Sequence, residues 1–531
     1  MSDVPKPIVL IALDGFGISL ERRGNAIAAA EKPTLDRFER RYPLAALQAS
    51  GIAVGLPWGE AGNSEVGHLT MGAGRVIYHH LPRIITAIQD GSFYENRAFL
   101  GVLEHVRQRG SSLHLLGLVS SGSVHSYFDH LLALLELAKR SGDPPVFIHA
   151  ITDGRDAPPQ EGITVIGDFE ARLRSRYPRA VLTSLIGRFY AMDRDERWER
   201  IRAAYELLVA GRGERFEKPT AYLSACYGRG TTDEFIEPAG RAAADGGAAG
   251  RIRAGDGLIF FNFREDSMRE ITAAFAAEPF AGFDREQLAD LKVATMTDYG
   301  EDYPGIEAAF PPLEIHWPLA RVLAEAGKRQ LHIAETEKYA HVTYFFNGGV
   351  EKPFSEEERV LVPSLSVPHF DERPEMRTPE ITEQIVARWG EYDFILGNFA
   401  NADMVGHTGN FAATVKAVEV LDRALGRLTE TALERGGVLM MTGDHGNAEA
   451  KLHPISGEPT TEHTANPVPL YLVGKGYERT ADRNPAEILA KKKEVRGILT
   501  DIAPTILELL HIAKPDEMTG KSLLPTLLQE R

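Results

Sequence analysis

Short apolar runs rich in β-branched residues alternate with segments of helical periodicity along the whole chain. This alternation is typical of parallel β-sheets whose strands are joined by crossover helices. With 531 residues the chain is too long for one hydrophobic core, so we expect two or three domains. The pattern therefore predicts an α/β protein, in which the Ala/Gly-rich stretch 239–250 forms a flexible surface loop.

Polar clusters follow three of the apolar runs that lie near the two ends of the chain. Residues 8–13 lead to Asp14, residues 394–396 lead toward Asp403, and residues 438–442 lead to Asp444 and His445. In open α/β sheets, ligands bind beyond the carboxyl ends of the strands. These clusters can share one site only if the two ends of the chain meet, so the middle of the chain is predicted to be an insertion.

The middle of the chain repeats this arrangement with arginine in place of metal-binding groups. Runs 146–151, 181–186 and 258–261 lead to short turns that carry Arg155 and Asp156, Arg188, and Arg264; Arg194 and His125 lie in similar positions. Arginine grips carboxylate or phosphate through two parallel hydrogen bonds. Each arginine alone is more typical of a solvated surface, but their shared position at strand ends predicts a site for a small polyanion.

Carboxylates and imidazoles at the two ends suit divalent metal ions. The candidate ligands are Asp14, Ser64, Asp403, His407, Asp444, His445 and His463. Singly, Asp403 and His407 fit a surface helix contact, Asp444 and His445 a glycine-rich turn, and His463 an ordinary histidine. Together, the candidate ligands are more numerous than one metal ion needs, so a site for two metal ions is predicted.

Ser64 and Lys338 are the candidate reactive groups near this site. Ser64 lies among small residues at the predicted start of a helix, where a metal could deprotonate its oxygen and backbone amides could hold a phosphate. The alternative is a helix N-cap serine with no ligand. Lys338 lies between carboxylates, where it either neutralises a phosphoryl transition state or forms an ion pair.

The composition of the chain excludes some classes of binding partner and indicates a cellular compartment. Lys and Arg total 59 against 75 Asp and Glu, a formal net charge of −16, which argues against nonspecific binding to nucleic acid or an anionic membrane. Cys226 is the single cysteine, which excludes an intrachain disulfide framework and indicates a reducing cytoplasm. The first apolar run, residues 8–13, is too short for a signal peptide or a membrane span.

Six motifs, in order along almost the whole chain, together resemble the cofactor-independent phosphoglycerate mutases of the alkaline phosphatase superfamily. They are Leu13-Asp14-Gly15-Phe16-Gly17, the stretch Asn63 to His68, Thr152 to Asp156, Gly187 to Arg194, Ala334 to Asn347, and Thr442 to Asn447. The resemblance implies an alkaline-phosphatase-like, mainly parallel sheet flanked by helices, with a second α/β domain inserted. We place the metal-binding domain at residues 1–78 and 314–531, and the inserted substrate-binding domain at residues 79–313.

The resemblance also implies roles for individual residues. Asp403, His407 and His463 would bind one metal, and Asp14, Ser64, Asp444 and His445 the other. The substrate would be held by His125, Arg155, Asp156, Arg188, Arg194, Arg264 and Lys338. The two ions are expected to be Mn²⁺, with Zn²⁺, Co²⁺ and Mg²⁺ as alternatives, and no 2,3-bisphosphoglycerate is required. A monomer is expected.

The implied reaction interconverts 3-phosphoglycerate and 2-phosphoglycerate in glycolysis and gluconeogenesis. The Ser64 alkoxide attacks the phosphoryl group, the glycerate stays bound and reorients, and its 2-hydroxyl then attacks phosphoserine. Asp156 would move protons to and from the glycerate hydroxyls. The two domains should close to exclude water, with hinges near residues 77–82 and 308–316.

Two positions depart from the family pattern. Ser267 stands where a second phosphate-binding arginine is expected, and Arg269 is the nearest substitute by sequence. Tyr127 stands where a histidine is expected after His125 and Ser126. A metal-dependent phosphohydrolase, a different phosphomutase such as one acting on pentose phosphates, and a binding or scaffolding protein without turnover remain as alternatives.

Overall fold

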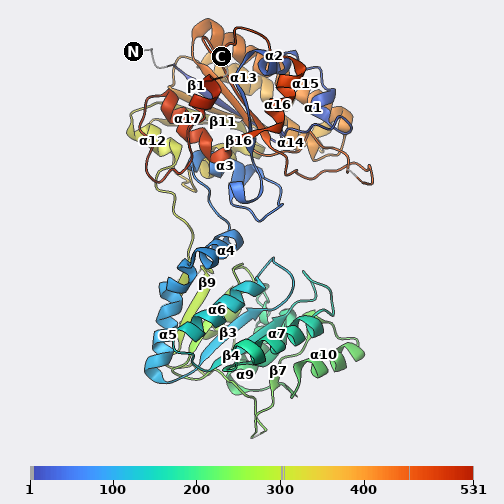
Figure 1. The fold of residues 1–531 in the computed structure, drawn as a ribbon, viewed down its shortest axis with the longest axis vertical. Coiled ribbons are helices and arrows are strands. Elements are labelled where there is room, and N and C mark those ends of the chain that lie inside the picture. Colours follow the sequence, from blue (N-terminus) through green and yellow to red (C-terminus); the bar gives the residue numbers. More distant parts are fainter. Residues whose placement is uncertain (1–4, 245, 301–302, 304, 454, 530–531) are drawn as a thin grey trace. The chain divides into compact units, whose positions relative to one another are not determined.

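The computed structural model describes residues 5–244, 246–300, 303, 305–453 and 455–529. Its contacts divide the chain into two units, which we call unit 1 (residues 1–79 and 313–531) and unit 2 (residues 80–312). Each unit contains one sheet with helices packed against it (Figure 1). Unit 2 is therefore an insertion between the two segments that form unit 1.

Within the described residues, the sheet of unit 1 has eight strands. In order across the sheet they are β12 (Glu357–Val362), β11 (Gln330–Glu335), β13 (Phe394–Phe399), β1 (Ile8–Leu13), β14 (Val438–Gly443), β15 (Val468–Gly474), β2 (Leu44–Gln48) and β16 (Val495–Ile498). β1 pairs in parallel with β13 on one side and β14 on the other, so the two ends of the chain meet in the middle of the sheet. β15 is antiparallel to both of its neighbours.

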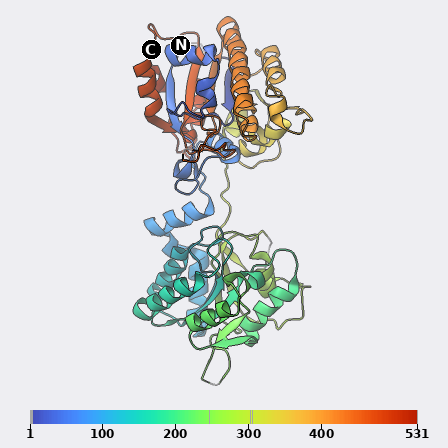
Figure 2. The same ribbon diagram turned by 90° about the vertical axis from the view of Figure 1, so that its right-hand side faces the viewer.

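Both faces of this sheet are buried. Alternate residues of β1 point into two different apolar clusters: Ile8 and Leu10 into one, Val9 and Ile11 into the other. Figure 2 shows helices on the two sides of the sheet. The helices of unit 1 are α1 (Ala26–Ala29), α2 (Pro33–Arg41), α3 (Ser64–Ala73), α12 (Leu319–Glu325), α13 (Thr378–Ala387), α14 (Asn401–Gly406), α15 (Phe411–Arg435), α16 (Pro485–Lys493), α17 (Ile502–Leu509) and α18 (Leu524–Leu528).

Unit 2 also has an eight-stranded sheet within the described residues. In order across the sheet its strands are β10 (Glu307–Phe310), β9 (Lys292–Thr297), β8 (Gly257–Phe260), β3 (Leu113–Leu118), β4 (Val146–Thr152), β5 (Ala180–Gly187), β7 (Ala239–Arg241) and β6 (Glu214–Phe216). Its helices are α4 (His80–Asp90), α5 (Arg97–Arg109), α6 (Phe128–Arg140), α7 (Gly162–Arg176), α8 (Arg188–Ala191), α9 (Trp198–Ala210), α10 (Pro219–Gly228) and α11 (Arg269–Ala276). The pairing is parallel except between β5 and β7.

The α/β class and the mainly parallel sheets predicted from the sequence are confirmed. The flexible loop predicted at residues 239–250 is wrong for its first part, because β7 pairs there with β5 and β6. Residue 245 lies outside the described residues. The expected hinge at residues 77–82 overlaps the start of α4, and Pro82 lies in the first turn of this helix, where proline is tolerated. Among the described residues, no helix has the length and apolar character needed to cross a membrane.

His130 on α6 predicts a pH dependence of the stability of unit 2. Its ring is fully buried, with neither nitrogen hydrogen-bonded among the described residues, and burial lowers its pKa to about 3. The unfolded chain binds a proton near pH 6.5 and the folded chain does not, so stability is present above that pH and lost below it. Between about pH 7.5 and pH 5 we expect this residue to remove about 2 kcal/mol of unfolding free energy.

The variant His130→Leu should reduce that loss, because leucine has no group to protonate. Urea unfolding of both proteins at the two pH values measures the difference. An equal loss of stability in the variant and the parent would show that His130 is not responsible.

Candidate functional site

The predicted metal ligands and reactive groups of unit 1 gather at one edge of its sheet. The neighbouring parallel strands β11, β13, β1 and β14 end at this edge. Directly beyond these strands lie Lys338, Asp403, Asp14 and Asp444, in that order. Gly15, with φ +70°, makes the turn after β1, and a Cβ there would lie 2.8 Å from the Cα of Asp403. Only glycine allows Asp14 and Asp403 to approach this closely.

Ser64 is the first residue of α3, and its neighbour Asn63 is the N-cap. The Asn63 side chain accepts a hydrogen bond from the amide of Val66, so the alternative of Ser64 as the N-cap is wrong. At Gly67 a Cβ would lie 2.6 Å from the carbonyl oxygen of Asp444. The absence of a side chain at Gly67 thus lets the first turn of α3 pack directly against the loop after β14.

The hydroxyl oxygen of Ser64 is surrounded by three charged or titratable groups. Lys338 Nζ lies 2.7 Å away, Asp14 Oδ1 3.0 Å away, and His445 Nε2 3.0 Å away. Lys338 Nζ also donates to Asp14 Oδ1 and to Asp403 Oδ2, both at 2.8 Å. Ser64 is 6% exposed and Lys338 4% exposed, so this ammonium and the serine oxygen meet in a largely desolvated place.

Asp403 is the centre of the remaining ligands. Its Oδ1 lies 3.2 Å from Nε2 of His407 and 3.2 Å from Nε2 of His463. His445 Nε2 lies 3.4 Å from Asp14 Oδ1 and 3.9 Å from Asp403 Oδ1. Donor atoms of Asp403, His445 and His463 all lie within 4.8 Å of one another. The structure thus brings all seven residues that we predicted as ligands into one cluster.

The carboxylates of the cluster lie close together, so positive charge beside them is required to offset their mutual repulsion. Burial alone would raise the pKa of Asp14, but the Lys338 ammonium and the adjacent His445 together outweigh it and hold this pKa well below its usual range. Burial would lower the pKa of His445, but Asp444 and Asp14 outweigh it and raise the pKa to about 10. Within the described chain, Lys338 and the imidazoles supply the cations beside these acids.

The donor set fits divalent metal ions. Asp444 Oδ1 accepts from the amides of Gly15 and His445, while Oδ2 is buried and has no hydrogen-bond partner among the described residues. A buried carboxylate oxygen without a donor is costly unless a cation binds there. Together, carboxylate oxygen and imidazole nitrogen are ligands that Mn²⁺, Zn²⁺ and Co²⁺ accept.

His68 and Asn398 belong to this site, and the sequence analysis missed both. Nδ1 of His68 donates to the carbonyl oxygen of Ser64 at 2.9 Å, and Nε2 accepts from the Asn398 amide at 3.2 Å. The same amide donates to Asp14 Oδ2 at 2.7 Å. Both ring nitrogens of His68 are thus engaged, one with the Ser64 backbone and one with Asn398, which in turn contacts Asp14. His68 nevertheless lies near enough to Asp14 and Asp444 to resemble a ligand. Its i,i+4 spacing from Ser64 was the signal that could have indicated it.

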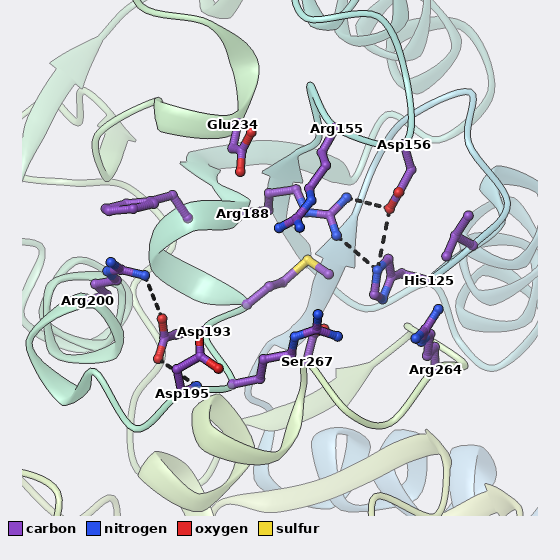
Figure 3. A pocket seen from close by; sticks show the side chains of 14 residues that line it. His125, Arg155, Asp156, Arg188, Asp193, Asp195, Arg200, Glu234, Arg264 and Ser267 are labelled. Atoms are coloured by element: carbon purple, nitrogen blue, oxygen red, sulfur yellow. Dashed lines mark hydrogen bonds and ion pairs between the residues drawn. The ribbon is translucent and has the colours of Figure 1, made fainter. Parts of the chain in front are cut away.

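The predicted anion-binding residues of unit 2 line one cavity of about 220 Å³ (Figure 3). They come from the loops after β3, β4, β5 and β8, which are neighbours and parallel, so their carboxyl ends share one edge of the sheet. The lining residues that the sequence analysis had selected are His125, Arg155, Asp156, Arg188, Arg194 and Arg264. Lys338 is the exception, because it belongs to the cluster in unit 1.

Arg188 is held in place by two carboxylates. Its Nη1 donates to Asp153 Oδ1 at 2.6 Å. The same Nη1 donates to Asp156 Oδ2 at 2.5 Å, and Nη2 lies 2.9 Å from His125 Nε2 (Figure 3). Burial and the adjacent Arg188 lower the pKa of His125 to about 4, so the ring is neutral near pH 7 and its Nε2 accepts from Arg188. Asp153 was not predicted as a site residue.

Further residues of the cavity were also missed. They are Val124, Phe189, Met192, Asp193, Asp195, Arg200, Glu234 and Ser267. Arg200 lies over the ring of Phe189, 3.8 Å from its centroid, and donates to Asp193 at 2.7 Å. The suggestion that Arg269 replaces the expected arginine at Ser267 is wrong, because Arg269 donates to the carbonyl of Tyr299 and does not line the cavity.

A metal-ligand cluster at the carboxyl edge of an α/β sheet defines a class of metalloenzyme. The family model of the metalloenzyme superfamily matches residues 6–514, and the chain belongs to this superfamily. A 2,3-bisphosphoglycerate-independent phosphoglycerate mutase of Moorella thermoacetica is 48% identical over 522 residues, which cover 98% of this chain and 99% of that protein. One of Methanosarcina acetivorans is 47% identical, covering 99% of both.

A solved structure agrees with these relatives. The phosphoglycerate mutase of Leishmania mexicana, crystallised at low cobalt concentration, shares 30% identity over 98% of each chain, with a TM-score of 0.54. The chain belongs to the family of 2,3-bisphosphoglycerate-independent phosphoglycerate mutases. Superfamily membership and the donor set together support the binding of divalent metal.

Proposed function

We propose that the protein interconverts 3-phosphoglycerate and 2-phosphoglycerate, without 2,3-bisphosphoglycerate, through a phosphoserine intermediate on Ser64. The observation that carries this proposal is the position of the Ser64 oxygen, 2.7 Å from Lys338 Nζ and 3.0 Å from both Asp14 and His445. An ammonium at this distance stabilises a serine alkoxide and offsets negative charge on a phosphoryl group that reaches it. The names of the relatives supply the substrate.

Two divalent ions, Mn²⁺ in our proposal, would be held by the seven ligands. Asp403, His407 and His463 would hold one ion, and Asp14, Ser64, Asp444 and His445 the other. When bound, the ions supply positive charge that lowers the pKa of the Ser64 hydroxyl and neutralises phosphoryl oxygens. Zn²⁺, Co²⁺ and Mg²⁺ are the alternatives that such a donor set also accepts.

In the first half of the reaction, Ser64 Oγ reacts as the alkoxide and forms a bond to phosphorus, and the bond from phosphorus to the 3-oxygen of glycerate breaks. Asp156, which begins this half protonated, delivers the proton that this oxygen needs. The arginines of unit 2 hold the glycerate through its carboxylate, so it reorients without leaving. In the second half the 2-hydroxyl attacks phosphoserine, Asp156 takes its proton, and the bond from phosphorus to Ser64 Oγ breaks.

Phosphorus NMR of 3-phosphoglycerate incubated with the purified protein and Mn²⁺ tests this function. We expect 2-phosphoglycerate to form without added 2,3-bisphosphoglycerate and with negligible inorganic phosphate. Release of phosphate in place of 2-phosphoglycerate would identify a phosphohydrolase, and no change in either compound would identify a protein without this turnover.

We also propose an oligomeric state, a compartment and a class of partner for the protein. We propose a monomeric enzyme of the cytoplasm with a small-molecule substrate and no nucleic-acid or membrane partner. A net charge of −16 and a single buried cysteine support this proposal. Gel filtration with light scattering should give the mass of one chain, and a larger mass would contradict the monomer.

A further inference from the structure

Asp266 contacts several of the predicted substrate-binding residues of unit 2, although no role has yet been assigned to it. Its Oδ2 accepts from Arg194 Nη1 at 2.9 Å and from Arg264 Nε at 3.1 Å, and Arg264 Nη2 also lies 3.1 Å away. Its Oδ1 lies 3.8 Å from Nδ1 of His125. One carboxylate therefore joins two arginines that line the cavity, Arg194 and Arg264, and lies beside the ring of His125.

Ser267 fixes the orientation of this carboxylate. Its backbone amide and its hydroxyl both donate to Asp266 Oδ1, at 2.7 and 3.0 Å, and Ser267 is only 3% exposed. Oδ1 is thus directed toward Ser267, which leaves Oδ2 for the two arginines. Burial would raise the pKa of Asp266, but the hydrogen bond from Ser267 and the charge of Arg264 outweigh it and keep the group ionised.

Arg194 and Arg264 are half-exposed side chains whose guanidinium groups meet at this carboxylate. Their side chains are 50% and 46% exposed, and two guanidinium groups that converge on one place repel each other. A long side chain in solvent loses its orientation unless a partner fixes it. Arg188, by comparison, is 8% exposed and is fixed by Asp153 and Asp156.

We propose that Asp266 is a positioning residue, which Ser267 orients and which holds Arg194 and Arg264 together as a pair ready to bind one anionic group of the substrate. That group is the carboxylate or the phosphate of a phosphorylated three-carbon acid. This inference rests on the proposed function, because it takes the arginines of unit 2 as the substrate-binding groups. The alternative role for Asp266 is that its carboxylate competes with the substrate for Arg194 and Arg264 and so weakens substrate binding.

The variant Asp266→Asn distinguishes these roles in steady-state kinetics with saturating Mn²⁺. If Asp266 positions the arginines, we expect KM for 3-phosphoglycerate to rise about tenfold while kcat changes less than about threefold. Ser267→Ala should act in the same direction by about threefold, because the backbone amide still donates to Asp266. Asp266→Glu keeps the charge and should recover part of the loss.

A matched control tests whether the loss of any aspartate charge in unit 2 has the same effect. Asp298 is exposed and accepts from the amide of Gly300, and Asp298→Asn should leave both constants as in the parent.

A fall in KM for Asp266→Asn would overturn the proposal and support competition, and an unchanged KM, or a loss of kcat alone, would also overturn it. Thermal unfolding shows whether each variant folds; if Asp266→Asn does not fold, Ser267→Ala carries the test with the same criteria. Calorimetric titration with 3-phosphoglycerate measures binding without turnover. A parent protein that binds this ligand without converting it would contradict the proposed function, while the order of affinities among the variants would still decide the role of Asp266.

Discussion

Replacing Ser64 with alanine is expected to lower turnover by at least about 10⁴-fold, since the variant has no oxygen that can accept the phosphoryl group. The fold should persist, because alanine is a good residue for the first turn of α3 and Asn63 still caps the helix. Phosphorus NMR measures turnover, and circular dichroism with thermal unfolding measures folding.

Ser50 provides the matched control for Ser64. It is also a buried serine of unit 1, 3% exposed, and its hydroxyl donates to the carbonyl of Ala465. Ser50→Ala should keep turnover near that of the parent even if it unfolds at a lower temperature. A Ser64→Ala protein with parental turnover would exclude covalent catalysis by this residue.

Removal of metal is expected to have the second large effect. A chelator in excess should abolish turnover and lower the unfolding temperature, because ions that bind only the folded state stabilise it. Mn²⁺ should restore both properties, and separate additions of Zn²⁺, Co²⁺ and Mg²⁺ would rank the alternatives. Turnover at the parental rate in protein shown by mass spectrometry to contain no metal would contradict the account.

Asp403 is the ligand whose loss should matter most. It is 2% exposed and contacts Lys338, His407 and His463. Asp403→Asn removes the charge at the centre of the cluster, and we expect a loss of turnover of about 10³-fold with weaker metal binding in a chelator competition. His453→Ala is a control, since the His453 side chain, among the described residues, accepts hydrogen bonds from amides of its own loop through Nδ1.

Much of this site could be predicted from the sequence, because strand ends are visible in the hydrophobic pattern. The runs before Asp14 and Asp444 are buried strands, and the rule that parallel strands present their carboxyl ends together places the two residues side by side. The same rule applied to β4, β5 and β8 grouped Arg155, Arg188 and Arg264 around one cavity. Metal-binding side chains beyond the strands of one sheet, and arginines beyond the strands of the other, were thus enough to predict both clusters.

Residues that act through other residues could not be predicted in this way. The role of His68 depends on which groups its two ring nitrogens meet, and one of these is Asn398, 330 positions later in the chain. Asp266 was not selected from the sequence, because its pairing with Arg194 brings together two loops that lie far apart in the chain. The guess for Arg269 failed because it used distance along the chain, whereas the side chain points to Tyr299.

The strand β7 was missed for a different reason. Alanine and glycine are depleted in strands, and a segment of three residues is too short to show an alternation of apolar and polar side chains. Its pairing with β5 and β6 is set by the backbone and by tertiary contacts. Local propensity alone therefore predicted a loop.

Mass spectrometry of the protein quenched in acid during turnover tests the central claim most directly. With 3-phosphoglycerate and Mn²⁺ present, the account predicts a fraction of chains that carry one phosphoryl group, located on the peptide that contains Ser64. The Ser64→Ala protein should show none. Steady turnover of the parent with no phosphorylated Ser64, or with the phosphoryl group on another residue, would contradict the account.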